Sequence, residues 1–128
     1  MRKFALAASA AAAFFAVSVV VAPSASATAD GCGDLSNGQL CIKHPSTPGG
    51  TYTTEYFKHS GGDVQVQLGY QSKYDDTTQP KHFDSPWLTA KSGKTVKHGR
   101  YLTLDKGWCI RALMKTHDDD FVGKWYCL

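Results

Sequence analysis

Alternation of apolar and polar residues is the clearest pattern in this chain, and it is strongest between Val64 and Gln71. In the run V-Q-V-Q-L-G-Y-Q, one parity carries Val, Val, Leu and Tyr, and the other carries Gln, Gln, Gly and Gln. Successive side chains of a strand point to opposite faces, so this period of two predicts a half-buried strand. Residues 51–59, rich in Thr, Tyr and Phe, predict a strand before it. Ser60–Asp63 is typical of a turn, so we expect these two strands to pair as a hairpin.

The rest of the chain contains further short strand patterns and no helical one. Residues 94–104 predict a strand with a bulge at Gly99, and residues 83–90 predict a weak strand interrupted by Pro86. Residues 73–86 are polar, contain two prolines and are predicted to form a long loop. No segment keeps helical periodicity over three turns. About seven short strands in one small domain predict an all-β fold, an antiparallel sandwich or a small barrel.

The C-terminal strands predict both a hairpin and a disulfide. The runs WCIRALMK (108–115) and FVGKWYC (121–127) flank the polar turn T-H-D-D-D. In an antiparallel register centred on Asp118, Cys109 faces Cys127 and Arg111 faces Trp125. The same register places six apolar residues on one face of the hairpin: Trp108, Ile110, Ala112, Met114, Val122 and Tyr126. Because a slip of one residue would destroy both matches, we predict a Cys109–Cys127 bond.

The two remaining cysteines lie on either side of a second hairpin signal. Cys32 and Cys41 flank D-L-S-N-G-Q-L, in which Asn37-Gly38 is a typical hairpin turn. A Cys32–Cys41 bond would close that hairpin, whereas the alternative connectivities would join the first hairpin to the last. Zinc binding is disfavoured, because the chain has no C-x-x-C pair and no cysteine at zinc-finger spacing from a histidine. Two bonds give this sequence a disulfide-stapled framework.

The first 29 residues predict a signal peptide. Arg2 and Lys3 form a positive start, an apolar run extends from Phe4 to Ala22, and Ala27-Thr28-Ala29 supplies small residues for cleavage. We therefore expect a signal peptide over residues 1–29 and a single secreted domain over residues 30–128, working outside the cytoplasm, where disulfides persist.

Charge narrows the range of partners. Without Arg2 and Lys3, 12 of the 14 basic residues remain against 11 acidic ones, which lowers the formal net charge from +3 to +1. This balance does not favour nucleic acid or an anionic membrane. We expect no nucleic-acid partner, no membrane association after signal cleavage, no cofactor, and a monomer.

Aromatic residues are the strongest indication of a binding surface. Exposed aromatics on a rigid sheet can stack on sugar rings or on a protein partner. The Trp125–Arg111 pair predicts a cation–π contact at the surface, and Trp87 lies at the edge of the long loop. The candidate binding residues are Trp87, Trp125, Arg111, Tyr52, Tyr56 and Tyr74. The alternative is that such aromatics fill the core of a domain short of aliphatic residues.

Two other chemistries have weaker support. A small secreted nuclease would need a general base, a general acid and a cation, for which Glu55, His117 and either Arg100 or Arg111 are the right types. No spacing joins these residues. The run Asp118-Asp119-Asp120 offers carboxylates for a cation such as calcium, but it lacks the alternation and the glycine of calcium loops. We therefore interpret it as a solvated turn and predict no metal site.

Short motifs also resemble a known family. These are G-C-G at residues 31–33, the alternating strand near the middle, and G-W-C-I at residues 107–110 followed by a second cysteine near the C-terminus. Together they resemble small secreted proteins of filamentous actinobacteria of the spore-associated protein A type. The resemblance implies a secreted, cell-surface-associated β domain without assigned catalysis, and it transfers no functional residue.

From these observations we expect a non-enzymatic extracellular binding module that engages a polymer or a protein surface through aromatic and loop residues. One alternative is a secreted inhibitor or toxin-like protein that binds another protein through residues 73–86. The other is the small nuclease-type hydrolase.

Overall fold

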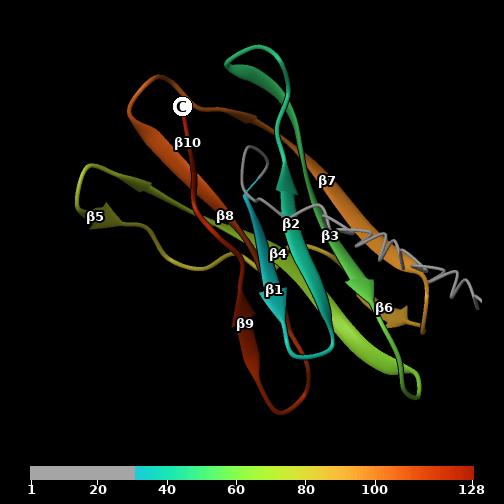
Figure 1. The fold of residues 1–128 in the computed structure, drawn as a ribbon. Helices are drawn as coiled ribbons and strands as arrows, with labels where there is room; N and C mark the ends of the chain where they lie inside the picture. Colours follow the sequence, from blue (N-terminus) through green and yellow to red (C-terminus); the bar gives the residue numbers. More distant parts are fainter. Residues whose placement is uncertain (1–30) are drawn as a thin grey trace, which may run out of the picture.

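The computed structural model describes residues 31–128 (Figure 1). In it, segments in which apolar and polar residues alternate form the strands of two antiparallel sheets. The predicted signal peptide, residues 1–29, lies outside the described residues. The first sheet has the order β1-β2-β3-β7. Its strands are β1 (Cys32–Leu35), β2 (Gly38–Lys43), β3 (Gly49–Lys58) and β7 (Thr95–Thr103).

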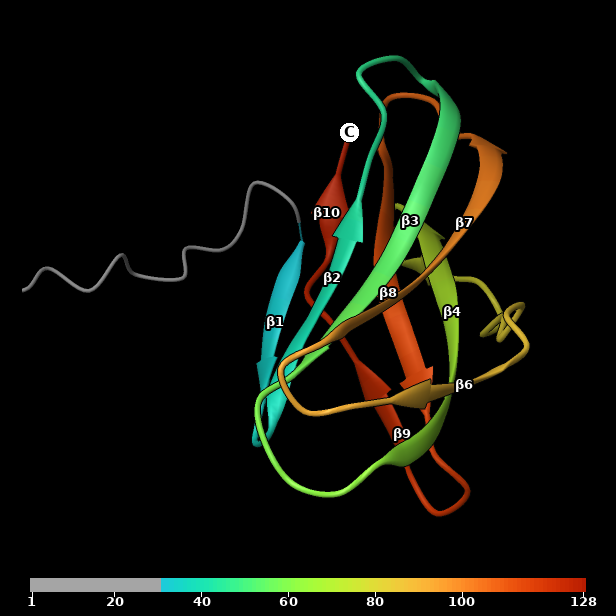
Figure 2. The ribbon, with the colours of Figure 1, turned by 90° about the vertical axis from the view of Figure 1, so that its right-hand side faces the viewer.

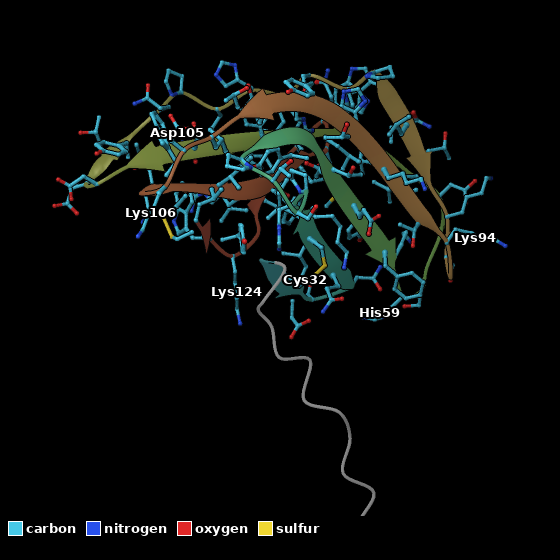
Figure 3. The ribbon with its side chains drawn as sticks, turned by 90° about the horizontal axis from the view of Figure 1, so that it is seen from above. Cys32, His59, Lys94, Asp105, Lys106 and Lys124 are labelled. Atoms are coloured by element: carbon cyan, nitrogen blue, oxygen red, sulfur yellow. A yellow bond between two sulfur atoms is a disulfide. The ribbon has the colours of Figure 1, made fainter. Side chains whose placement is uncertain are left out.

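The second sheet has six strands, and its main path runs β10-β8-β4-β5, with β6 paired to β4 and β9 paired to β8. Its strands are β4 (Val64–Tyr74), β5 (Thr77–Thr78), β6 (Trp87–Ala90), β8 (Trp108–Lys115), β9 (Asp120–Val122) and β10 (Tyr126–Cys127). The two sheets face each other and curl into a half-barrel (Figure 2). Seen from above, β7 forms an arch between Lys94 and Asp105 (Figure 3). Residues 31–128 contain no helix long and apolar enough to cross a membrane.

The core lies between the sheets, where the inward parity of each long strand is apolar. Side chains with at most 3% exposure come from both sheets: Leu40, Ile42, Tyr52, Val66, Leu68, Ile110, Ala112 and Met114. Burying one such large side chain contributes about 1.5–3 kcal/mol. Thr54 is one polar exception on the buried face of β3, and its hydroxyl donates across the core to the Gly69 carbonyl at 2.7 Å. That bond satisfies the buried hydroxyl and ties the sheets together.

Both predicted disulfides are confirmed. Cys32 is bonded to Cys41 and Cys109 to Cys127, and each pair occupies directly facing positions of an antiparallel pair of strands. The all-β, disulfide-stapled fold class is therefore confirmed, with ten strands in place of about seven. The strand predicted at residues 121–127 is divided into β9 and β10, and β5, only two residues long, is too short for an alternation pattern to reveal it. The first hairpin turns at Ser36-Asn37, one residue earlier than expected, because Leu35 pairs with Gly38.

The predicted hairpin between residues 51–59 and 64–71 is wrong. β3 is paired on one side with β2 and on the other with β7, and β4 belongs to the opposite sheet. The connection at residues 59–63 therefore passes from one sheet to the other. Asn37 fixes this crossing, because its side chain donates to the Ser60 carbonyl at 2.7 Å and accepts from the Ser60 amide at 3.2 Å. A local turn signal cannot distinguish a hairpin from such a crossing.

The predicted bulge at Gly99 is also wrong, and a shift of register occurs elsewhere. β3 and β7 pair without interruption from Gly49–Thr103 to Phe57–Thr95. In contrast, β8 pairs with β10 in the expected register but with β9 one residue out of step. One extra residue is therefore inserted around Gly123. As a result Val122, predicted to lie in the core, is 40% exposed, and Phe121 packs against the core in its place.

Candidate functional site

Cationic and aromatic side chains gather on the outer face of the six-stranded sheet. Strand alternation directs Arg111 and Lys115 of β8 away from the core, and the neighbouring strand β4 directs Gln71 and Lys73 to the same side. Aromatic rings pack against the three cations Lys73, Arg111 and Lys115. We call the set the cation–aromatic face; it consists of Lys73, Phe83, Trp87, Arg111, Lys115, His117 and Trp125.

Trp125 forms one end of this face. The guanidinium carbon of Arg111 lies 4.4 Å from the centre of the Trp125 ring, and Lys73 Nζ lies 4.5 Å from it. Arg111 is held in place by Gln71, whose Oε1 accepts from Nε at 3.0 Å and from Nη2 at 2.7 Å. The predicted contact between Arg111 and Trp125 is thus confirmed. Partial burial lowers the pKa of Arg111, but arginine remains charged at neutral pH.

Trp87 forms the other end. Its ring stacks on that of His117, with 4.2 Å between centroids and 20° between planes. Lys115 Nζ lies 4.8 Å from the centre of the Phe83 ring and 5.8 Å from that of Trp87. Because Arg111 and Lys115 are four residues apart on one strand, the two ends are separated by roughly 13 Å. An extended ligand could therefore contact both ends at once.

The charge of this face is mainly positive. Lys73, Arg111 and Lys115 carry like charges, and each lies over an aromatic ring. Asp120 occupies the position opposite Lys115 in the pairing of β8 with β9, and its carboxylate forms an ion pair with Lys81, whose Nζ lies 3.7 Å from Asp120 Oδ2. An acidic ligand would find three cations on a sheet that is stapled at one end by the Cys109–Cys127 bond.

Three tyrosines in the predicted binding set lie elsewhere. Tyr52 and Tyr56 do share a face of β3, but that face is turned inward, and both side chains are buried in the core. Their hydroxyls donate to the carbonyls of Pro48 and Asn37 at 3.4 and 3.2 Å. The prediction that they are exposed is therefore wrong. Tyr74 is exposed, as expected. It lies at the end of β4, on the face opposite to Gln71 and Lys73, and packs beside Trp108 with 5.3 Å between ring centroids.

The structure does not bring together the residues proposed for a nuclease. Glu55 lies on the outer side of the four-stranded sheet, opposite Cys41 on β2 and Lys97 on β7. His117 stacks on Trp87, and Arg111 binds Gln71, both on the outer side of the other sheet. Arg100 points into the seam between the sheets. The general base, acid and cation therefore have separate neighbours.

Asp118 and Asp119 form the turn that was expected. The hydroxyl of Thr116 accepts from the amides of Asp118 and Asp119 at 3.3 and 3.0 Å, and the Thr116 amide donates to the Asp119 carbonyl at 2.8 Å. Asp120 begins β9. Within residues 31–128, no group of three or more His, Cys, Asp or Glu side chains is arranged to hold a metal ion.

Segment 73–86, predicted as a long loop, is mostly bound to the edge of β4. It begins with the tight β4–β5 hairpin around Asp75, whose φ is +52°. Gln79 then donates to the Ser72 carbonyl at 2.9 Å, His82 exchanges two backbone bonds with Tyr70, and Ser85 binds Leu68. Only the short hairpin tip is therefore free of these bonds.

A polar cluster that the sequence did not reveal joins β7 to the segment bound along the edge of β4. We call this junction between the two sheets the seam; Arg100 lies on one side of it and Asp84 on the other. Arg100 on β7 donates to both carboxylate oxygens of Asp84, at 3.0 and 3.1 Å. It also donates to the Thr54 hydroxyl at 2.8 Å and to the Tyr52 carbonyl at 3.2 Å. His98 Nε2 lies 3.5 Å from the same carboxylate.

The partners in this seam come from three distant parts of the chain, so no motif could join them. The only sequence signal is that His98 and Arg100 occupy the same parity of their strand as Val96 and Leu102, which pack on the core. Because Asp84 accepts from Nε and Nη2 of Arg100 while Thr54 and Tyr52 accept from Nη1, we interpret the cluster as a clasp that holds the half-barrel closed along this seam.

Comparison with known proteins finds no matching family model, no matching curated relative and no matching solved structure. The resemblance to the spore-associated protein A type therefore stays a prediction, and function is argued from the residues alone.

Proposed function

We propose that this protein is a secreted, non-enzymatic binding module that holds an acidic extracellular polysaccharide on the cation–aromatic face. The observation that carries the proposal is the contact of Arg111 and Lys73 with the Trp125 ring, with Trp87 and Lys115 further along the same face. The predicted signal peptide supports export. The two disulfides are compatible with an extracellular protein.

The chemistry of the face favours this ligand class over others. Aromatic rings offer flat apolar area against which the apolar side of a sugar ring can stack. Arg111 presents a planar fork that suits a carboxylate, and the lysines add mobile point charges. A neutral polymer would use the rings alone, whereas an acidic sugar chain would use the rings and the cations together.

Binding is preferred to the two alternatives for structural reasons. A nuclease needs its base, acid and cation in one place, and Glu55 lies on a different sheet from Arg111, whereas His117 lies in the turn between β8 and β9. An inhibitor that docks through residues 73–86 would use a segment largely occupied with β4.

The test measures how far the purified protein migrates in native gels that contain an acidic polysaccharide such as polygalacturonate. Gels that contain neutral dextran serve as the reference, and slower migration in the acidic gel is called retention. We expect retention by the acidic polymer, weakening as salt rises, since exposed charges are screened over about 10 Å at 0.1 M salt. Trp125→Ala and Trp87→Ala should each weaken retention about fivefold, which corresponds to about 1 kcal/mol for each lost contact between an indole ring and a sugar ring.

A matched control exists on the opposite sheet. Tyr101 is 71% exposed on the outer side of β7, so Tyr101→Ala removes an exposed aromatic without touching the proposed face. This variant should be retained like the unmodified protein. Equal losses in Tyr101→Ala and Trp125→Ala, or retention by neither polymer, would refute the proposal. Tighter binding to RNA than to the polysaccharide would refute the ligand class.

A further inference from the structure

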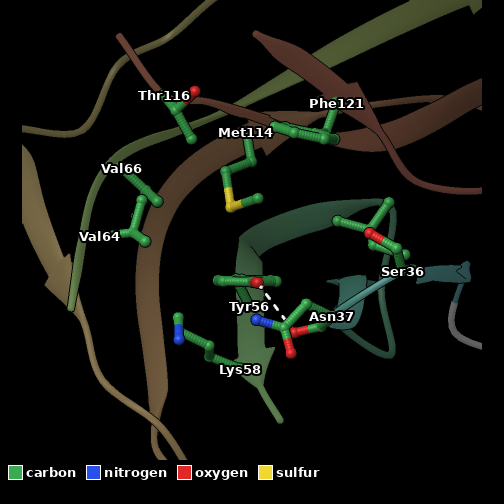
Figure 4. A pocket seen from close by; sticks show the side chains of 10 residues that line it. Ser36, Asn37, Tyr56, Lys58, Val64, Val66, Met114, Thr116 and Phe121 are labelled. Atoms are coloured by element: carbon green, nitrogen blue, oxygen red, sulfur yellow. Dashed lines mark hydrogen bonds between the residues drawn. The ribbon is translucent and has the colours of Figure 1, made fainter. Parts of the chain in front are cut away.

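A small pocket opens between the two sheets, at the end of the half-barrel where the turn of the first hairpin meets β9 (Figure 4). Its volume is about 150 Å³. Val64, Val66, Met114 and Phe121 form apolar walls, and Tyr56 and Lys58 supply polar groups. The pocket lies on the inner side of β4 and β8, so it is separate from the cation–aromatic face.

Lys58 is the unusual member of the lining. It is only 2% exposed, although lysine is almost never fully buried without a partner of opposite charge. Its ammonium donates to the Ser60 carbonyl, and residues 31–128 place no carboxylate within ion-pair distance of it. An ammonium has three protons to donate, so this group retains donors for an anion. A buried charge without a counter-ion is costly, and an anionic ligand would relieve that cost.

The polar end of the pocket is rigid. The side chain of Asn37 donates to the Ser60 carbonyl at 2.7 Å and accepts from the Ser60 hydroxyl at 3.0 Å, which holds the acceptor of Lys58 in place. The Tyr56 hydroxyl donates to the Asn37 carbonyl at 3.2 Å, drawn as a dashed line in Figure 4. Burial raises the pKa of Tyr56, so this hydroxyl stays protonated. A ligand would therefore meet a preformed site and lose little free energy in ordering it.

We propose that this pocket binds a small carboxylate that bears one apolar ring or a short branched chain. A cavity of about 150 Å³ with apolar walls is large enough for one benzene ring, which sets the size of the apolar part. The carboxylate would accept from Lys58, and the ring would pack against Met114 and Val66. The ammonium selects an anion over a neutral or cationic molecule of the same shape.

The pocket contains its own reporter. Met1 and Met114 are the only methionines in the sequence, so a spectrum of methyl-labelled methionine has one signal from the described domain. Sodium benzoate is the probe, and benzamide is its neutral match. We expect benzoate to shift the Met114 methyl signal saturably, with at least about tenfold tighter binding than benzamide, as expected for a charge-assisted hydrogen bond.

Substitutions separate the charge from the cavity. Lys58→Met nearly keeps the length of the side chain and removes the ammonium. The affinity of this variant for benzoate should therefore fall to its affinity for benzamide. Lys94→Met, at an exposed lysine, should leave the preference for benzoate unchanged. Val64→Phe should fill the mouth of the pocket and weaken both ligands, since Val64 lines the pocket and is itself 37% exposed.

Absence of a saturable Met114 shift with benzoate, equal affinity for benzoate and benzamide, or retained preference in Lys58→Met would overturn the proposal. If Lys58→Met did not fold, the comparison of benzoate with benzamide in the unmodified protein would still decide it. None of these results bears on the polysaccharide face, which lies on the other side of the sheet.

Discussion

Gly69→Ala tests the packing of segment 82–85 against β4 more sharply than any other single substitution. A Cβ at position 69 would lie 1.9 Å from the His82 carbonyl oxygen and 2.8 Å from the Phe83 Cα. Both neighbours are backbone atoms, so no side-chain rotation can relieve the clash. The segment must move away from β4, and the two backbone bonds between Tyr70 and His82, at 2.8 and 3.0 Å, must lengthen or break.

The cost follows from these contacts. Two hydrogen bonds contribute about 1 kcal/mol each, and forced overpacking adds about 1–3 kcal/mol. Replacing glycine restricts the unfolded chain, which returns about 0.4–1 kcal/mol. We expect the free energy of unfolding to fall by about 3 kcal/mol. In a domain of this size that corresponds to a loss of roughly 12–24 °C in Tm.

Urea unfolding of the oxidised protein, followed by tryptophan fluorescence, measures this change. Trypsin provides a local readout, because Lys81 lies at the start of the displaced segment and should be cleaved faster in Gly69→Ala. Gly62→Ala is the matched control, since a Cβ there has nothing within 4 Å, and its stability should change by less than about 0.5 kcal/mol. A Gly69→Ala protein within about 1 kcal/mol of the unmodified protein, with Lys81 still resistant, would refute this account of the edge.

Three further predictions concern the seam, the core and a disulfide. Asp84→Asn removes the charge that faces the largely buried Arg100, and urea unfolding should show a loss of about 2 kcal/mol; an unchanged midpoint would contradict the clasp. Burial raises the pKa of Tyr52 above its ordinary value of 10.0, so its contribution to stability is complete below pH 10 and lost as the pH rises through the folded-state pKa. Circular dichroism against pH should then show unfolding at higher pH in Tyr52→Phe, and an unshifted alkaline transition would count against this. Replacing Cys109 and Cys127 by alanine opens a link across 18 residues and should cost about 3 kcal/mol in thermal or urea unfolding, whereas a loss below about 1 kcal/mol would show that the bond adds little.

The C-terminal hairpin was predictable because two independent constraints, the cysteine pair and the apolar alternation, required the same register. Arg111 and Trp125 followed from that register, and the structure places them in contact. The register shift at Gly123 was not predictable, because a bulge changes which residues face inward without leaving an unambiguous pattern. Val122, which was assigned to the core, is consequently exposed, and Phe121 packs against the core.

Other features depend on partners far away in sequence. Strand β3 carries Thr54 and Lys58 on the same buried face as its tyrosines, so its alternation did not show which face is inside. Thr54 is satisfied by Gly69 and Arg100, which no local pattern connects to it. The same limit applies to the pocket around Lys58 and to the seam. In each case elements distant in the sequence surround a buried polar group, so its burial can be understood only from the folded structure.

We propose that Trp87 and Trp125 belong to one binding face, and their indole N–H signals report ligand contact at both residues. The chain has three tryptophans, and the third, Trp108, packs against the core on the other side of the sheet. On addition of an acidic oligosaccharide to the ¹⁵N-labelled protein, we expect the indole signals of Trp87 and Trp125 to shift together while that of Trp108 stays in place. Unchanged signals from Trp87 and Trp125, or a shift confined to Trp108, would rule out the proposed binding face.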